Sequence, residues 1–135
     1  MRQEFHRRER ALKTISSEFV QYIGVVSDRG SKYAVSAGYV RSEADIKTFI
    51  KRLKRAKKFA KATHNTWAAR LADGAEIKND DGEGGAGMII LQMMAREEIT
   101  DAIIVVTRWY GGTHLGGDRF RHVKTSVQHL FDQLD

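Results

Sequence analysis

The stretch DAIIVVTRWYGGTHLGGDRF, residues 101–120, decides the fold of this chain. Residues 102–106 form an uninterrupted apolar run, which is typical of a central strand that is buried on both faces. Two glycine pairs follow between residues 111 and 117, so the strand is expected to end in a tight loop. A helix then places one apolar face toward the core, formed by Phe120, Val123, Val127, Leu130, Phe131 and Leu134.

Further strands are predicted upstream of this unit. Two β-rich runs, residues 19–26 and 32–40, are split by Asp28-Arg29-Gly30, and glycine at this point favours an antiparallel hairpin. Residues 64–72 alternate between apolar and polar positions, which predicts another strand. Residues 76–78 follow an Asp-Gly turn and are expected to form a short return strand.

Two helices are predicted between these strands. Ser42 is a candidate N-cap, and Glu43 and Asp45 suit the positive end of a helix dipole. The helix that follows is expected to carry a basic outer face as far as Lys61. Its apolar stripe consists of Ile46, Phe49, Ile50 and Leu53. A second helix over residues 88–94 is apolar on nearly all sides and is expected to be buried.

This order of elements predicts an α/β fold of the α+β sandwich kind. We expect a four- to five-stranded mixed sheet with about three helices packed on it. The chain has 135 residues, which is long enough for one domain with a real core. We expect a basic N-terminal arm over residues 1–14 and a single domain over residues 15–135.

Composition excludes several classes of protein. The chain has no cysteine, so disulfides, thiolate metal sites and cysteine nucleophiles are excluded. No apolar run is long enough to span a bilayer, and a chain without cysteine suits a reducing compartment, so we expect a cytoplasmic protein. The formal net charge of +6 points to acidic proteins or polyanions as partners.

The basic helix face is the most informative surface feature. No acidic residue lies between positions 47 and 61, whereas a solvated face usually interleaves acids with its lysines. An RNA or an acidic protein would fit this face, and an ordinary solvated surface is an equal alternative. Trp109 and Tyr110 could stack on bases or anchor a protein interface. The candidate binding residues are Lys51, Lys54, Arg55, Lys57, Lys58, Lys61, Arg108, Trp109 and Tyr110.

Two glycine-rich or acidic motifs allow a second set of predictions. The loop GGTHLGGDRF could bind an anion, but its spacing matches no phosphate-binding loop. A tight turn capped by Asp118 is favoured instead. We therefore expect phosphate to have no effect on the melting temperature. The run Asp80-Asp81-Gly82-Glu83 lacks the spacing of a calcium loop, so a polar turn is favoured over a metal site. We expect Asp80 or Asp81 to meet Arg108 or Arg119 in a mainly structural charge cluster.

The histidines and hydroxyl residues do not indicate an enzyme. His64 could act as a general base near Asp80 or Asp81, but no motif supplies a nucleophile. His122 and His129 lie seven residues apart on the last helix and are expected to be solvated rather than zinc ligands. We therefore expect no catalytic residues, no metal and no cofactor.

Three segments together resemble the Impact N-terminal domain family. They are AKATHNTWAAR (60–70), DDGEGGAG (80–87) and VVTRWYGGTHLGGDRFRH (105–122), and the third is closer to eukaryotic than to bacterial members. The resemblance covers roughly residues 15–134. The matching motif positions are His64, Asn65, Arg70, Asp80, Asp81, Gly82, Glu83, Ala86, Gly87, Arg108, Trp109, Tyr110, Gly111, Gly112, Leu115, Gly116, Asp118, Arg119 and Phe120.

The resemblance implies a fold like the second domain of a small-subunit ribosomal protein. It also implies a non-enzymatic translational regulator of the stress response, which binds the activator of the amino-acid-starvation initiation-factor kinase and restrains that kinase. Ribosome and actin association belong to the same implication. A general RNA-binding domain is the alternative, and an enzyme acting on a phosphorylated substrate is the third interpretation. Because family members usually carry a further domain, we expect either an excised domain or a compact single-domain member.

Overall fold

Five strands form one sheet in the computed structural model, which describes residues 13–134. The strands are β1 (Val20–Asp28), β2 (Ser31–Tyr39), β3 (His64–Arg70), β4 (Glu76–Asn79) and β5 (Ala102–Trp109). Their order in the sheet is β1-β2-β5-β3-β4, and all neighbours pair in the antiparallel direction. The α+β prediction is confirmed. The sheet is antiparallel throughout rather than mixed, because each new strand returns beside a partner that runs the opposite way.

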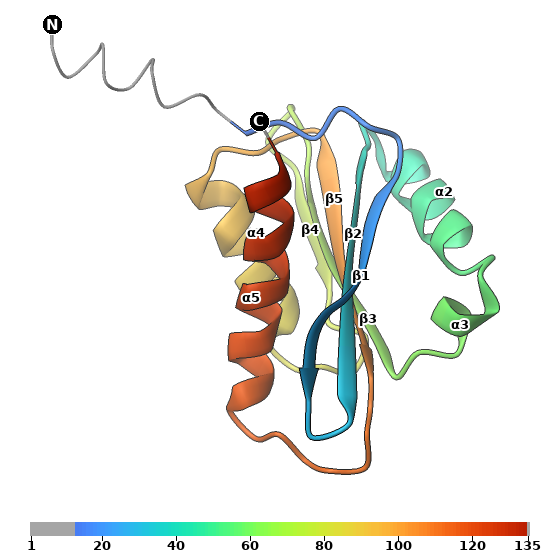
Figure 1. The fold of residues 1–135 in the computed structure, drawn as a ribbon. Helices are drawn as coiled ribbons and strands as arrows, with labels where there is room; N and C mark the ends of the chain where they lie inside the picture. Colours follow the sequence, from blue (N-terminus) through green and yellow to red (C-terminus); the bar gives the residue numbers. More distant parts are fainter. Residues whose placement is uncertain (1–12, 135) are drawn as a thin grey trace, which may run out of the picture.

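Helices cover both faces of this sheet (Figure 1). They are α2 (Glu43–Leu53), α3 (Lys57–Ala60), α4 (Ala86–Arg96) and α5 (Asp118–Gln133). In β5, Ile103 and Val105 pack in the core cluster under α2 and α3, whereas Ile104 and Val106 pack in the cluster under α4 and α5. β5 lies between β2 and β3 and is buried from residue 102 to residue 108, which confirms the prediction of a central strand.

The basic helix is divided into two pieces, where the sequence predicted one helix running to Lys61. Ser42 caps α2 as expected, since its hydroxyl accepts a hydrogen bond from the Asp45 N–H at 3.1 Å. The helix nevertheless ends at Leu53, and α3 starts afresh at residue 57. A continuous helix would point Phe59 away from its own apolar stripe. The break lets Phe59 enter the core, where it is 2% exposed.

The other expected elements show smaller differences. The helix expected over residues 88–94 spans Ala86–Arg96, but it is not buried on all sides, because Met88 is 42% exposed. The basic arm expected over residues 1–14 lies mostly outside the described residues. At its end, Lys13 donates a hydrogen bond to the carbonyl of Phe131 at 3.1 Å.

The predicted hairpin is confirmed, and its tip is tied to α5. Arg29 and Gly30 form a two-residue turn, both with positive φ (46° and 84°). His122 was expected to be solvated, but it is 5% exposed, and its Nε2 lies 2.7 Å from Asp28 Oδ2. The reason is that α5 lies flat on the sheet, so that residues beside its apolar stripe also face inward. His129 is half-buried, with its ring centroid 5.3 Å from that of Tyr22.

Acid should break this tie between the hairpin and the helix. Hydrogen bonds from Arg29 and, next, from His122 lower the pKa of Asp28 from 3.8 to about 2. Because the folded pKa lies below the unfolded one, the stabilisation is present above about pH 4 and is lost as the pH falls toward 2. We expect Asp28→Asn to melt at a lower temperature than the wild type at pH 6, and the difference to vanish near pH 2. An unchanged difference across that range would contradict the assignment.

Candidate functional site

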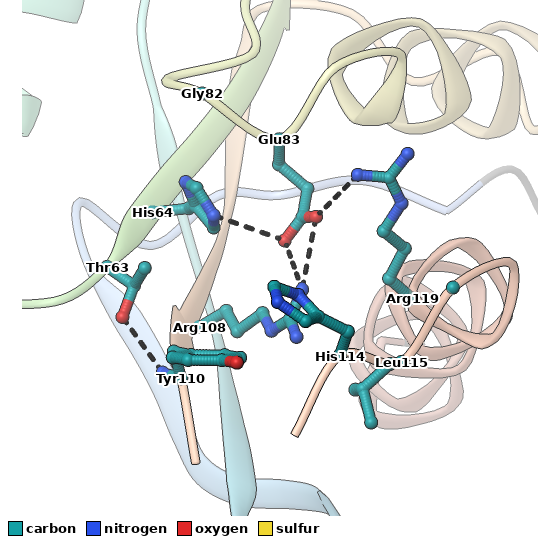
Figure 2. A pocket seen from close by; sticks show the side chains of 10 residues that line it. Thr63, His64, Gly82, Glu83, Arg108, Tyr110, His114, Leu115 and Arg119 are labelled. Carbon is teal, nitrogen blue, oxygen red and sulfur yellow. Dashed lines mark hydrogen bonds and ion pairs between the residues drawn. The ribbon is translucent and has the colours of Figure 1, made fainter. Parts of the chain in front are cut away.

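A pocket of about 390 Å³ opens at the end of the sheet where β3 begins and β5 ends (Figure 2). The β3–β5 register places His64 opposite Arg108, so the segments around residues 64 and 108 meet at this edge. The turn before α4 supplies Gly82 and Glu83, and the loop before α5 supplies His114 and Leu115. Residues from all three motif segments quoted above therefore line one pocket.

Glu83 lies at the centre of this pocket and is 2% exposed. Arg108 Nη1 donates to both of its carboxylate oxygens, at 3.2 and 3.1 Å. Arg119 Nη1 lies 3.5 Å from Oε1, and His64 Nε2 lies 3.8 Å from Oε2. Figure 2 shows the three basic side chains converging on the one carboxylate. The cluster therefore holds two guanidinium groups against one acid, most of it out of contact with water.

The charge cluster was expected at this place, but its acid was predicted wrongly. Asp80 instead accepts the N–H groups of Gly85 and Gly87 at the start of α4, at 3.0 and 2.8 Å, and the Gly85 bond is the main reason that its pKa is lowered. Asp81 accepts the Asn65 N–H at 2.7 Å. Both aspartates are taken up by nearby backbone donors, whereas Glu83 has a longer side chain and reaches the arginines.

Side chains of the first motif segment, residues 60–70, form hydrogen bonds that connect β3 to neighbouring elements. His64 Nδ1 lies 2.8 Å from the carbonyl of Asp81, and a carbonyl only accepts, so Nδ1 carries the hydrogen and Nε2 faces Glu83. Asn65 donates to the carbonyl of Phe59 at 3.0 Å and accepts from the Thr107 hydroxyl at 2.7 Å. His64 was considered as a general base beside Asp80 or Asp81. Within residues 13–134 it faces Glu83 instead, and no group of three or more acids and histidines is placed to hold a metal.

The glycine loop is a tight turn, but Asp118 does not cap the helix that follows. Gly117 is the N-cap of α5 and makes no side-chain cap. Asp118 instead forms ion pairs with Arg121 at 3.2 Å and Arg29 at 2.6 Å, and these lower its pKa, Arg121 more than Arg29. The Asp118 carboxylate therefore pairs with Arg29 of the hairpin turn and does not accept hydrogen bonds from the backbone of its own helix.

The predicted basic surface is exposed, and Arg108 is separate from it. Lys51, Lys54, Arg55, Lys57, Lys58 and Lys61 are all exposed. Trp109 is half-buried; its Nε1–H donates to the carbonyl of Lys58 at 3.0 Å, and Lys58 Nζ lies 5.0 Å from the ring centroid. Tyr110 is 42% exposed. Arg108 is 6% exposed, because strand alternation turns it into the pocket.

A groove that the sequence did not predict lies beside this basic surface. The groove has a volume of about 350 Å³ and lies between α2 and the strands β3 and β4. Ile50 and Trp67 supply apolar lining, and Lys51 and Lys54 supply charge. No local signal identified Trp67 as part of it, because the groove exists only where α2 packs across the sheet. No helix within residues 13–134 is long and apolar enough to cross a membrane.

Comparison with known proteins gives consistent matches. Residues 29–131 match a family model described as the Impact N-terminal domain. A protein described as "Protein IMPACT homolog" from Caenorhabditis elegans is 38% identical over 113 residues, which cover 78% of this chain and 44% of that protein. One of the same description from Saccharomyces cerevisiae is 35% identical over 108 residues, covering 76% and 42%. The chain thus spans less than half the length of these curated relatives.

A solved structure shares the fold. It is described as "Crystal structure of an hypothetical protein", and it superposes with a TM-score of 0.76 over 90% of this chain and 60% of that chain. The two sequences are 23% identical, so the likeness shows a common fold alone.

Proposed function

Because this chain belongs to the Impact N-terminal domain family, we propose that it is a non-enzymatic binding module in translational regulation. Its proposed partner is the scaffold protein that activates the amino-acid-starvation initiation-factor kinase, and binding would restrain that kinase under stress. Association with the ribosome, with actin as a further partner, and a cytoplasmic location belong to the same proposal. The observation that carries it is the exposed basic surface of α2 and α3 beside the groove.

The composition of this surface favours a protein partner. The groove is lined by Ile50 and Trp67 and bordered by lysines, and an apolar centre with a charged rim is the usual anatomy of a protein interface. Lys51 and Lys54 are exposed on its border and would meet acidic side chains. A general RNA-binding domain is the second candidate, because Tyr110 is an exposed aromatic side chain at a sheet end that also carries Lys58 and Lys61.

Charge reversal tests the proposed surface. Lys54→Glu, Arg55→Glu and Lys58→Glu together should leave the free energy of unfolding nearly unchanged, within about 0.5 kcal/mol for each exposed site. The same change should abolish binding to the kinase-activator scaffold and co-sedimentation with ribosomes. A matched control reverses Lys78, Arg96 and Lys124, which are exposed away from the α2–α3 surface and change the net charge equally. Equal binding by both triple variants would show that the basic surface is only solvated.

Salt and nuclease treatment separate the two candidate partners. If about four phosphates of single-stranded RNA are contacted, the logarithm of the affinity falls with that of salt at a slope near −3, or about fiftyfold between 50 and 200 mM. A protein interface that is only steered by charge should lose much less affinity and mainly associate more slowly. We expect the shallower dependence, and we expect the complex to survive nuclease treatment. A steep slope with nuclease-sensitive binding would establish the RNA candidate instead.

A further inference from the structure

Three buried polar side-chain atoms have no hydrogen-bond partner among residues 13–134: Tyr33 Oη, Arg108 Nε and Arg119 Nε. Each of them carries a hydrogen to donate. They belong to one cluster, because Arg108 and Arg119 both approach Glu83 and the Arg108 guanidinium carbon lies 5.8 Å from the Tyr33 ring centroid. A buried donor without an acceptor is costly. Arg108 and Arg119 line the pocket and Tyr33 does not, so the two arginines favour a ligand there that accepts hydrogen bonds.

The charges of the pocket favour an anion. Glu83 offsets one of the two guanidinium groups, so the pair of arginines retains one excess positive charge. Arg108 already donates two hydrogen bonds to Glu83, so the excess charge lies mainly on Arg119, whose side chain is 37% exposed. His64 and His114 also line the pocket and carry no negative charge. An anionic ligand would therefore complete both the charge balance and the hydrogen bonding.

Two arginines reach the pocket from different elements. Arg108 comes from β5 and Arg119 comes from α5. The first N–H groups of α5 are not free for a ligand, because those of Asp118, Arg119 and Phe120 already donate to carbonyls of the preceding loop. Guanidinium groups that approach from two directions suit the tetrahedral oxygens of a phosphate better than the plane of a carboxylate.

We propose that this pocket binds a phosphate monoester group, with Arg108 and Arg119 as its main ligands. The pocket volume of about 390 Å³ leaves space for the group that bears the phosphate. The rings of Tyr110 and His114, whose centroids are 5.5 Å apart, provide an aromatic surface for that group. The sequence favoured a purely structural role for the glycine loop, without phosphate binding. In the proposed site the phosphate is bound by two arginine side chains instead, and only the fold brings these together (Figure 2). The site is separate from the groove and the α2–α3 surface, so either proposal can fail alone.

The test is a titration of the full ¹⁵N-labelled chain, followed by backbone and arginine side-chain NMR signals. Inorganic phosphate should cause saturable shifts at Gly116, Arg108 and Arg119, and acetate should bind more weakly. The phosphate group could belong to a nucleotide or to a phosphorylated side chain. AMP represents the first source and O-phosphoserine the second, and the compound that binds more tightly identifies the source. Adenosine and serine, which lack the phosphate, should not bind.

A pair of variants assigns any binding to the pocket. Arg119→Gln should weaken phosphate binding at least about tenfold, because it removes charge-assisted hydrogen bonds. Arg121→Gln is the matched control: its side chain is on the same helix, is 65% exposed, and pairs with Asp118 outside the pocket. The proposal is overturned if phosphate causes no saturable shift, if acetate binds as tightly, or if the two variants lose affinity equally.

Discussion

Replacing Glu83 with glutamine should lower the free energy of unfolding by about 3–5 kcal/mol, the largest loss that we expect from a single change of charge in this chain. Glutamine keeps the size of the side chain but removes its charge. Arg108 would then remain 6% exposed with an uncompensated charge, and Arg119 would lose its acidic neighbour. Chemical denaturation followed by circular dichroism measures this loss directly.

A surface ion pair provides the matched control. Glu76 pairs with Arg70 at 3.0 Å, a distance close to that between Glu83 and Arg108, but its side chain is 46% exposed. Glu76→Gln should therefore cost less than about 1 kcal/mol. A double-mutant cycle of Glu83→Gln with Arg108→Gln should show strong coupling, because each single change leaves the charge of the other residue buried without a counter-charge. Additive effects, or equal losses at positions 76 and 83, would refute a buried structural charge cluster.

Gly111→Ala should also destabilise the fold strongly, by about 3 kcal/mol, at the upper end of the usual range for overpacking. A Cβ at this position would lie 2.0 Å from the carbonyl carbon of Gly30 in the hairpin turn. Both groups are backbone, so neither can move aside by changing a rotamer. The same loop is held by the Gly111 N–H, which donates to the Ser31 hydroxyl at 3.1 Å. The thermal unfolding midpoint of the variant measures the loss.

Gly117 lies in the same loop and serves as the control for Gly111. Its φ is −67°, and a Cβ there would meet no atom within 4 Å. Gly117→Ala should therefore be neutral or stabilising by up to about 1 kcal/mol, because alanine restricts the unfolded chain. If both alanine variants melted at the same temperature, the close contact between the hairpin turn and the loop would not be the reason for glycine at position 111.

Much of the fold was predictable from local patterns. The apolar run at residues 102–106 predicted the central strand, and the Asp28-Arg29-Gly30 turn predicted the hairpin. Ser42 was correctly placed as the cap of α2. These features depend on backbone geometry and on periodic burial within a few residues, and such information is present in a short stretch of chain. The antiparallel sheet order was not predictable in this way, because it depends on pairings between distant segments.

The end of α2 shows where local information was insufficient. A basic face without acids over residues 47–61 suggested one helix. Phe59 gains more by entering the core beside Trp109, where their ring centroids lie 5.0 Å apart. That gain is available only once β5 has been placed under α3. Burial of one large aromatic side chain is worth about 1.5–3 kcal/mol, which exceeds the propensity of three residues to continue a helix.

By itself, the sequence determined which chemical groups are available: its three motif segments carry the acids, the arginines and the glycines. Tertiary structure alone decided which acid pairs with the arginines, and it selected Glu83 over Asp80 and Asp81. It also buried His122 against Asp28 and joined Gly30 to Gly111. The physical reason is that an ion pair forms over a few ångströms, and those distances are set by strand register and by the packing of helices on the sheet.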